Sequence, residues 1–281
     1  MLKQRIITAL LLLAVLIPAV WADHPLAFVL LTATMMGAAA WEWARLCAWS
    51  PWPARANGVA CALLCLFFWR EGGTRQAWPW LWWAVGAAWV LLAAGLLRGG
   101  VGAWLRLPAA LRWLVGMVAL FAAWVALVQA RTIGANFLFS VFVLVWGADV
   151  AAYFCGRFWG GRWIRRKLAV AISPGKTWEG ALGGLAVVMV LAFAWREWEP
   201  LSPWGATSLY GRLGEQGTVF LVVSVTFLTT MSVAGDLLES LFKRAAGVKD
   251  SSQLLPGHGG VLDRIDALLP VLPLVMLLCV R

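Results

Sequence analysis

The sequence predicts an all-α fold, a polytopic membrane bundle of about nine transmembrane helices. Of the 281 residues, 62% are hydrophobic and 13% are charged, whereas soluble domains average about 45–50% apolar and about 25% charged residues. The mean hydropathy is +0.81. Runs such as 77–97 and 218–234 approach or reach the roughly 17–25 residues that span a bilayer as a helix. We therefore expect an integral membrane protein.

Nine apolar runs account for the predicted helices in chain order. The first follows Lys3 and Arg5 and has the make-up of a signal peptide, but the later runs favour a retained helix. The third is shorter than a bilayer requires, which leaves the count open between eight and ten. The runs are 6–22, 25–46, 58–69, 77–97, 109–130, 133–155, 180–198, 217–238 and 261–280.

Tryptophan and cysteine fit this picture without a special role. Trp69, Trp78 and Trp104 stand near the ends of runs, which suits an interfacial belt. Cys61 and Cys65 are four residues apart, but no histidine or second cysteine pair is near enough in sequence to complete a zinc site. We interpret all five cysteines as small packing residues: Cys47, Cys61, Cys65, Cys155 and Cys279.

The net charge of +10 is more typical here of a membrane topology signal than of nucleic-acid binding. With the N-terminus in the cytoplasm, 17 of the 23 lysines and arginines fall on the cytoplasmic side and 6 on the other. The two longest polar stretches, 156–179 and 239–260, then share the cytoplasmic side. We expect membrane lipids as neighbours and no nucleic acid as a partner.

The stretch 235–266 carries most of the candidate chemistry. Four polar residues at i, i+3, i+4 and i+7 would share one face of a helix. Such a face either is a solvated helix end or lines a site, and spacing alone does not decide. The four residues are Asp236, Glu239, Ser240 and Lys243.

The last apolar run also brings charges to the membrane. Residues 267–280 would extend only about 21 Å as a helix, against a hydrocarbon core of about 30 Å. A spanning helix must therefore begin near Val261, which places Asp263, Arg264 and Asp266 at the membrane boundary. Charged residues at that depth usually have partners and a function.

Between these two helices lies a polar loop that suits a magnesium–phosphate site. Mg²⁺ is typically held by one or two carboxylates together with substrate phosphates. Glycines let backbone N–H groups approach phosphate oxygens closely. The loop contains Lys249, Asp250, Ser251, Ser252, Gly257, His258, Gly259 and Gly260.

A second polar region covers 146–180. Asp149 lies inside an apolar run, with Tyr153 at i+4 and Arg157 at i+8. These residues either form a structural ion pair or line a site.

The second part of this region reads SPGKTWEGALGG. Ser173 is a candidate N-cap with Pro174 at the first helical position, and Lys176 beside a helix N-terminus would favour an anion. Lys176 could equally be a topology anchor, and Glu179 a capping residue. Glycines 180, 183 and 184 fit close helix packing better than a nucleotide loop, and no Walker A motif occurs.

These motifs together resemble a known family. The segment 240–266, SLFKRxxxxKDSSxxLPGHGGxLDRID, resembles the signature of the phosphatidate cytidylyltransferases, also called CDP-diacylglycerol synthases. ISPGKTWEG (172–180) and GADVAAYFCGR (147–157) are similar to upstream motifs of that family. Ala267 and Val170 depart from the family pattern, at positions that are neither acidic nor basic. Because the resemblance begins near Trp146, we expect N-terminal transmembrane helices in 1–130 and a catalytic transmembrane region in 131–281.

The resemblance implies the reaction of CTP with phosphatidate to give CDP-diacylglycerol and pyrophosphate, dependent on one or two Mg²⁺ ions. It implies Asp236 and Asp263 as metal ligands, and catalytic roles for Asp236, Asp263, Lys249, His258 and Arg264. It further implies contacts with substrate from Lys176, Glu179, Ser240, Lys243, Arg244, Asp250, Ser251, Ser252, Gly259, Gly260 and Asp266. A phosphate monoester is already largely dianionic near pH 7, so we assign His258 to phosphate contact rather than proton abstraction.

The implied location is the cytoplasmic membrane of a bacterium, with the active site facing the cytoplasm; a homodimer is an open expectation.

Three alternative functions remain. A CTP-dependent lipid kinase would use the same acids but transfer the γ-phosphoryl group. An ion-coupled transporter could use Asp149, Asp236 and Asp263 as its pathway, although the polar residues gather on one side and no inverted repeat is visible. An inactive scaffold would not need every charged position of the signature.

Overall fold

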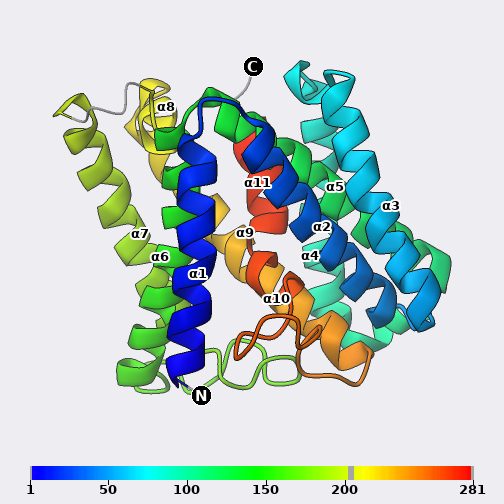
Figure 1. The fold of residues 1–281 in the computed structure, drawn as a ribbon. Helices are drawn as coiled ribbons and strands as arrows, with labels where there is room; N and C mark the ends of the chain where they lie inside the picture. The colour runs from blue at the N-terminus through cyan, green and yellow to red at the C-terminus, as the bar shows by residue number, and fades with distance from the viewer. Residues whose placement is uncertain (1, 202–205, 280–281) are drawn as a thin grey trace. The chain divides into compact units, whose positions relative to one another are not determined.

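The computed structural model describes residues 2–201 and 206–279 (Figure 1). These residues form helices and two isolated β-bridges, which confirms the predicted all-α class. The elements are α1 (Leu2–Trp21), α2 (Leu26–Leu46), α3 (Pro51–Arg70), η1 (Gly73–Arg75), α4 (Pro79–Arg106), α5 (Ala109–Ile133), α6 (Ala135–Trp159), α7 (Trp178–Trp198), η2 (Glu199–Leu201), α8 (Leu209–Glu215), α9 (Thr218–Ala245), α10 (Leu262–Ile265) and α11 (Leu268–Cys279).

Seven helices in the described part of the chain are long and apolar enough to cross a membrane. They are α2, α3, α4, α5, α6, α7 with its extension to Leu201, and α9. The short run 58–69 belongs to the full-length α3, because that helix already begins at Pro51, where a proline at the first position is favourable. The apolar part of α1, Ile7–Trp21, is shorter. The chain is therefore a polytopic membrane protein.

The last apolar run corrects our prediction of one helix starting near Val261. The run is broken into α10 (Leu262–Ile265) and α11 (Leu268–Cys279), with a turn at residues 266–267. Pro270 accounts for the break, because it has no N–H to give to the carbonyl of Asp266 and its ring would clash with that carbonyl. With 12 residues, α11 rises only about 18 Å. The predicted end of the run at Val280 lies outside the described residues.

The chain divides into two compact units that alternate along the sequence. Unit 1 consists of residues 1–77, 101–129 and 242–266, and unit 2 of residues 78–100, 130–241 and 267–281. One boundary coincides with Gly100, whose left-handed backbone (φ 64°) interrupts α4. The functional division that we predict at residue 130 is a separate matter and stays a prediction.

In unit 1, α2 and α3 lie side by side (Figure 1). Two glycines allow this approach. A Cβ atom at Gly37 would lie 2.8 Å from the carbonyl oxygen of Gly58, and one at Gly58 would lie 2.6 Å from the oxygen of Gly37. Larger residues at either position would force the two helices apart.

Three aromatic rings join the other parts of unit 1 to α2. The Trp43 ring lies 6.0 Å from Trp104 and 5.2 Å from Phe242, and the latter two are 4.3 Å apart, measured between centroids. Trp104 is 3% exposed. Its ring therefore packs against α2 and the end of α9 and does not face lipid, while the interfacial position that we predict for it stays a prediction.

In unit 2, α6 and α7 pack against each other over much of their length (Figure 1). A Cβ atom at Gly180 would lie 2.8 Å from the carbonyl oxygen of Ala152, and one at Gly184 would lie 2.8 Å from that of Ala148. These distances confirm the packing role that the sequence indicates for the two glycines.

The five cysteines are free thiols, and Cys47, Cys61 and Cys65 are buried. Burial raises the pKa of the Cys47 thiol to about 11, although Arg112 acts in the opposite direction. The Cys47 side chain is thus a neutral packing group near pH 7, as predicted.

Candidate functional site

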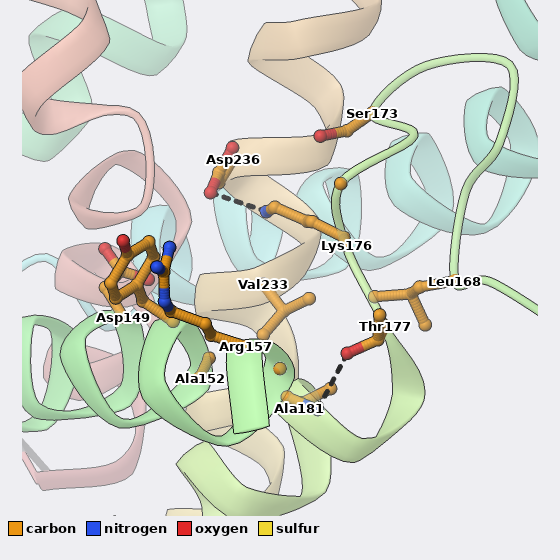
Figure 2. A pocket seen from close by; sticks show the side chains of 14 residues that line it. Asp149, Ala152, Arg157, Leu168, Ser173, Lys176, Thr177, Ala181, Val233 and Asp236 are labelled. Carbon is orange, nitrogen blue, oxygen red and sulfur yellow. Dashed lines mark hydrogen bonds and ion pairs between the residues drawn. The ribbon is translucent and has the colours of Figure 1, made fainter. Parts of the chain in front are cut away.

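Unit 2 contains a pocket of about 550 Å³, which we call the Lys176 pocket. Its wall is formed by α6, the loop before α7, the start of α7 and α9 (Figure 2). It is lined by Asp149, Ala152, Tyr153, Gly156, Arg157, Leu168, Ser173, Gly175, Lys176, Thr177, Gly180, Ala181, Val233 and Asp236. The pocket therefore gathers residues from both polar regions of the sequence.

An ion pair closes one side of this pocket. Lys176 Nζ lies 2.5 Å from Asp236 Oδ2, and the two side chains are 25% and 28% exposed. Figure 2 shows the lysine reaching from the loop toward the carboxylate on α9. Because both groups remain partly accessible, a ligand phosphate or a cation entering the pocket can compete for either partner.

Helix α6 contributes a second carboxylate and a second cation. Asp149, Tyr153 and Arg157 follow one another at steps of four residues and all line the pocket. This confirms that they share one face of α6, as their spacing predicts. The pocket thus combines two acidic side chains with two basic ones.

The start of α7 corrects one sequence prediction. The N-cap is Thr177, whose Oγ1 accepts a hydrogen bond of 3.1 Å from the backbone N–H of Gly180, and α7 begins at Trp178. Ser173 is not the cap because residues 169–173 form a turn closed by a hydrogen bond from Ser173 N to the oxygen of Ala169. The N-terminus of α7 still opens at the pocket, which Thr177, Gly180 and Ala181 line, and the positive end of the helix dipole favours an anion there.

Glu179 also differs from its predicted capping role. It is 3% exposed, and its Oε1 accepts hydrogen bonds of 3.0, 3.1 and 2.9 Å from the backbone N–H groups of Gly161, Trp163 and Ile164. The carboxylate thereby ties the loop after α6 to the start of α7. Its role as a substrate contact stays a prediction.

Unit 1 contains a second group of site residues, the Asp263 cluster, formed by Glu42, Lys243, Ser251, Ser252, Gly260 and Asp263. Asp263 Oδ1 lies 2.6 Å from Lys243 Nζ, and these side chains are 4% and 13% exposed. Oδ2 accepts from Ser251 N at 3.0 Å, Ser251 Oγ at 2.9 Å and Gly260 N at 2.8 Å. Both oxygens of Asp263 are thus engaged by protein donors.

Glycine is required next to this carboxylate. Gly259 has a left-handed φ of 84°, and a Cβ atom there would lie 2.6 Å from Asp263 Oδ2. The glycines of the loop therefore let the chain turn against Asp263, in addition to the phosphate role expected for them.

The remaining predicted residues belong to α9, to the loop that follows it, and to α10 with its C-terminal end. The loop between α9 and α10 holds His258, which is half-buried and has an Nδ1 atom without a hydrogen-bond partner among the described residues. Ser240 on α9 and Asp266 are half-buried, and four charged residues are exposed: Arg244, Lys249, Asp250 and Arg264. The structure leaves their predicted roles untested.

Sequence reasoning missed Glu42. This residue is 0% exposed on α2 and binds Ser251, Ser252 and the start of α10. The available signal was its position: it is the one acidic residue of the 21-residue apolar helix α2, where a charge indicates a partner.

The chain matches proteins of known family. The profile of the cytidylyltransferase family matches residues 3–280. The chain belongs to the cytidylyltransferase family. A phosphatidate cytidylyltransferase of Pseudomonas aeruginosa is 37% identical over 279 residues, which cover 97% of this chain and 95% of that protein. The enzyme of the same name from Haemophilus influenzae is 49% identical over 140 residues, covering 50% and 44%, and that of Brucella suis is 34% identical over 219 residues, covering 78% and 62%.

Membership of the cytidylyltransferase family makes the chain a nucleotidyltransferase and speaks against the ion-coupled transporter. The predicted dependence on Mg²⁺ then raises the question of which residues could hold the ion. No group of three or more histidine, cysteine or acidic side chains suited to a metal occurs in residues 2–201 and 206–279. Asp149 and Asp236 in one pocket nevertheless fit Mg²⁺, which needs only one or two carboxylates when phosphates and water complete its shell.

The two predicted metal ligands of this cytidylyltransferase differ in their surroundings. Asp236 lies in unit 2 and lines an accessible pocket. Asp263 lies in unit 1, where four donors already occupy its oxygens. Coordination by Asp263 would require Lys243 or another donor to move. Metal binding by either carboxylate stays a prediction.

Proposed function

We propose that this cytidylyltransferase transfers the cytidylyl group of CTP to phosphatidate. A phosphate oxygen of phosphatidate attacks the α-phosphorus of CTP, the bond from that phosphorus to the bridging oxygen breaks, and pyrophosphate leaves. CDP-diacylglycerol is the other product. The observation that carries the proposal is the Lys176 pocket, which combines Lys176, Arg157 and a helix N-terminus with two carboxylates. The names of the relatives support the choice of substrates.

The difficult step in this reaction is the approach of two anions. The lipid phosphate monoester has a second pKa of about 6 and is already an anion at pH 7, so no strong base is required. Lys176 and Arg157 lower the repulsion between the phosphates, as basic side chains do in other phosphoryl transfers. The positive end of the α7 helix dipole also favours a phosphate at the pocket.

Mg²⁺, which we propose as the cofactor, would neutralise phosphate charge when bound. Asp236 and Asp149 are the carboxylates of the pocket suited to hold it, and Asp263 is the third candidate. Lys176 has a second task in this scheme, because it balances the charge of Asp236 through the 2.5 Å ion pair.

The experiment that tests the activity uses purified protein in detergent with Mg²⁺, phosphatidate and CTP labelled on either the α- or the γ-phosphate. We expect the α-label in the lipid product and the γ-label in pyrophosphate. A γ-label in the lipid would instead identify a CTP-dependent lipid kinase. Asp236→Asn should strongly lower product formation at the Mg²⁺ concentration that saturates the wild type, whereas Asp23→Asn, a change of an exposed aspartate outside both site groups, should leave it unchanged.

We also propose that the protein lies in the bacterial cytoplasmic membrane, with the loop between α9 and α10 facing the cytoplasm. The asymmetry of its lysines and arginines supports this orientation. Single cysteines in place of the exposed Gln76 and Gln253, in a cysteine-free background, test it with a membrane-impermeant maleimide on spheroplasts. Only the cysteine at 76 should react before lysis.

A homodimer, which we also propose, is tested by the mass of the detergent-solubilised protein.

A further inference from the structure

Glu42 is a buried carboxylate with an unusually complete set of partners. Its side chain is 0% exposed. Oε1 accepts from Ser252 Oγ at 2.6 Å and Val261 N at 3.0 Å. Oε2 accepts from Leu262 N at 2.7 Å and lies 3.1 Å from Ser251 Oγ. Each oxygen therefore contacts one serine hydroxyl and one backbone N–H.

These four partners are the two ends of the segment 251–262. Ser251 and Ser252 stand at its beginning, and Val261 and Leu262 at its end, where α10 starts. The N–H groups at a helix start have no partner within the helix and are usually bound by a capping side chain of the same segment. Here Glu42 on α2, 219 and 220 residues away, supplies that acceptor.

The loop ends that Glu42 holds are also those that hold Asp263. Ser251 Oγ lies 2.9 Å from Asp263 Oδ2 and 3.1 Å from Glu42 Oε2. A hydroxyl has one proton, so Ser251 donates to one of these carboxylates at a time and lies between them. A Cβ atom at Gly260 would overlap both Ser251 Oγ and Glu42 Oε1. Little space is therefore left for Glu42 to move without disturbing the donors of Asp263.

We infer that Glu42 is a positioning residue for the cytidylyl transfer, acting through Ser251 and the start of α10 on Asp263. This inference rests on the proposed function. Glu42 does not need to touch substrate: it fixes the loop that carries Ser251, His258 and Gly260, together with the start of α10, which carries Asp263. Misplacing reactive groups by about 1 Å can lower a rate about 100-fold, so the exact attachment of this loop matters to the reaction.

Glu42→Gln tests the inference. The amide keeps the shape of the side chain, but its NH₂ group cannot accept hydrogen bonds and would face an N–H donor. We expect kcat to fall about 100-fold, with the KM for CTP changed much less, because the loss concerns positioning. Amide hydrogen exchange in 249–262 should become faster, while exchange in α6 and α7 stays the same. Glu71→Gln, an exposed glutamate in unit 1, is the matched control and should behave as wild type.

A purely structural role would give a different result, in which kcat per folded molecule stays at the wild-type value, the total activity falls only with the amount of folded protein, and Ser251→Ala adds its full effect to that of Glu42→Gln. Positioning through Ser251 instead predicts that the double variant is little worse than either single one. Wild-type kcat or wild-type exchange in a folded Glu42→Gln protein would overturn the inference. If that variant does not fold, Ser252→Ala removes the 2.6 Å contact from the loop side, and unchanged exchange and kcat there would overturn it as well.

The exchange measurement also separates this inference from the proposed function. If wild type made no CDP-diacylglycerol, the function would fail, while faster exchange of 249–262 in Glu42→Gln would still support the holding of the loop by Glu42. Slow exchange in both proteins would overturn that holding role, whatever the activity.

Discussion

Lys176 Nζ lies 2.5 Å from Asp236 Oδ2, so that the loop before α7 and helix α9 meet in an ion pair inside unit 2. Each side chain is about one quarter exposed, and such a pair in contact with water is worth little by itself. Its value lies in what can replace it: a phosphate can take the lysine and a divalent cation can take the carboxylate.

Replacing Lys176 by Gln should lower the kcat/KM for CTP about 100-fold, because one fixed donor to a charged group is lost from the site. The rate of CDP-diacylglycerol formation measures the effect. Lys167→Gln is the matched control: this lysine lies in the same loop, is exposed and donates to the carbonyl oxygen of Pro174. Equal activity of the two variants would contradict the role given to Lys176.

Replacing Gly260 by Ala should destabilise the protein and abolish activity. The added Cβ atom would overlap Ser251 Oγ and Glu42 Oε1, and overpacking of this kind typically costs about 1–3 kcal/mol. Thermal unfolding in detergent, followed by tryptophan fluorescence, gives the stability. Gly102→Ala serves as control, because its Cβ atom would meet no atom within 4 Å. A fully active, stable Gly260→Ala protein would show that the Asp263 cluster is looser than described.

Replacing Thr177 by Val should remove the N-cap of α7, since valine cannot accept the hydrogen bond from Gly180 N. Loss of a cap typically costs about 1 kcal/mol, which corresponds to roughly 2–4 °C in a chain of this size. Thr34→Val is the comparison: that hydroxyl is exposed and donates to a carbonyl within α2. Equal melting temperatures of both variants would argue against a stabilising cap.

Removing divalent metal with EDTA should abolish product formation, and added Mg²⁺ should restore it. Asp236→Asn should raise the Mg²⁺ concentration for half-maximal activity at least about 10-fold, because even the loss of a residue that only hydrogen-bonds to a metal ligand lowers metal affinity by about that factor. Titration of any residual activity, or direct Mg²⁺ binding by calorimetry, supplies the measurement. If Asp236→Asn needed the same Mg²⁺ concentration as the wild type, Asp236 would not be a metal ligand. Asp23→Asn is the control for the loss of one negative charge.

The sequence predicted the helical parts of the site well, because helical periodicity is a local property. The common face of Asp149, Tyr153 and Arg157 follows from their spacing alone. The ion pair between Lys176 and Asp236 could not be predicted from residue spacing, because spacing does not show which acidic side chain a lysine in a loop will contact.

Contacts made by loops were harder to predict. Glu179 binds three backbone N–H groups of the preceding loop, and backbone donors leave no trace in the sequence. The break between α10 and α11 could have been predicted from Pro270, but the length needed to span a bilayer suggested a continuous helix. Glu42 was missed because its partners lie more than 200 residues away.

That separation has a consequence for the synthesis of the protein. Ser251 follows Glu42 by 209 residues, so at about 5–20 residues per second the carboxylate is made roughly 10–40 s before its partners. During this interval α2 must enter the membrane with an acid that no loop yet binds. Unit 1 is therefore completed only when the chain has been translated as far as Asp266. A chain whose synthesis stops before residue 251 therefore contains Glu42 without any of the four loop donors that bind it in the complete fold.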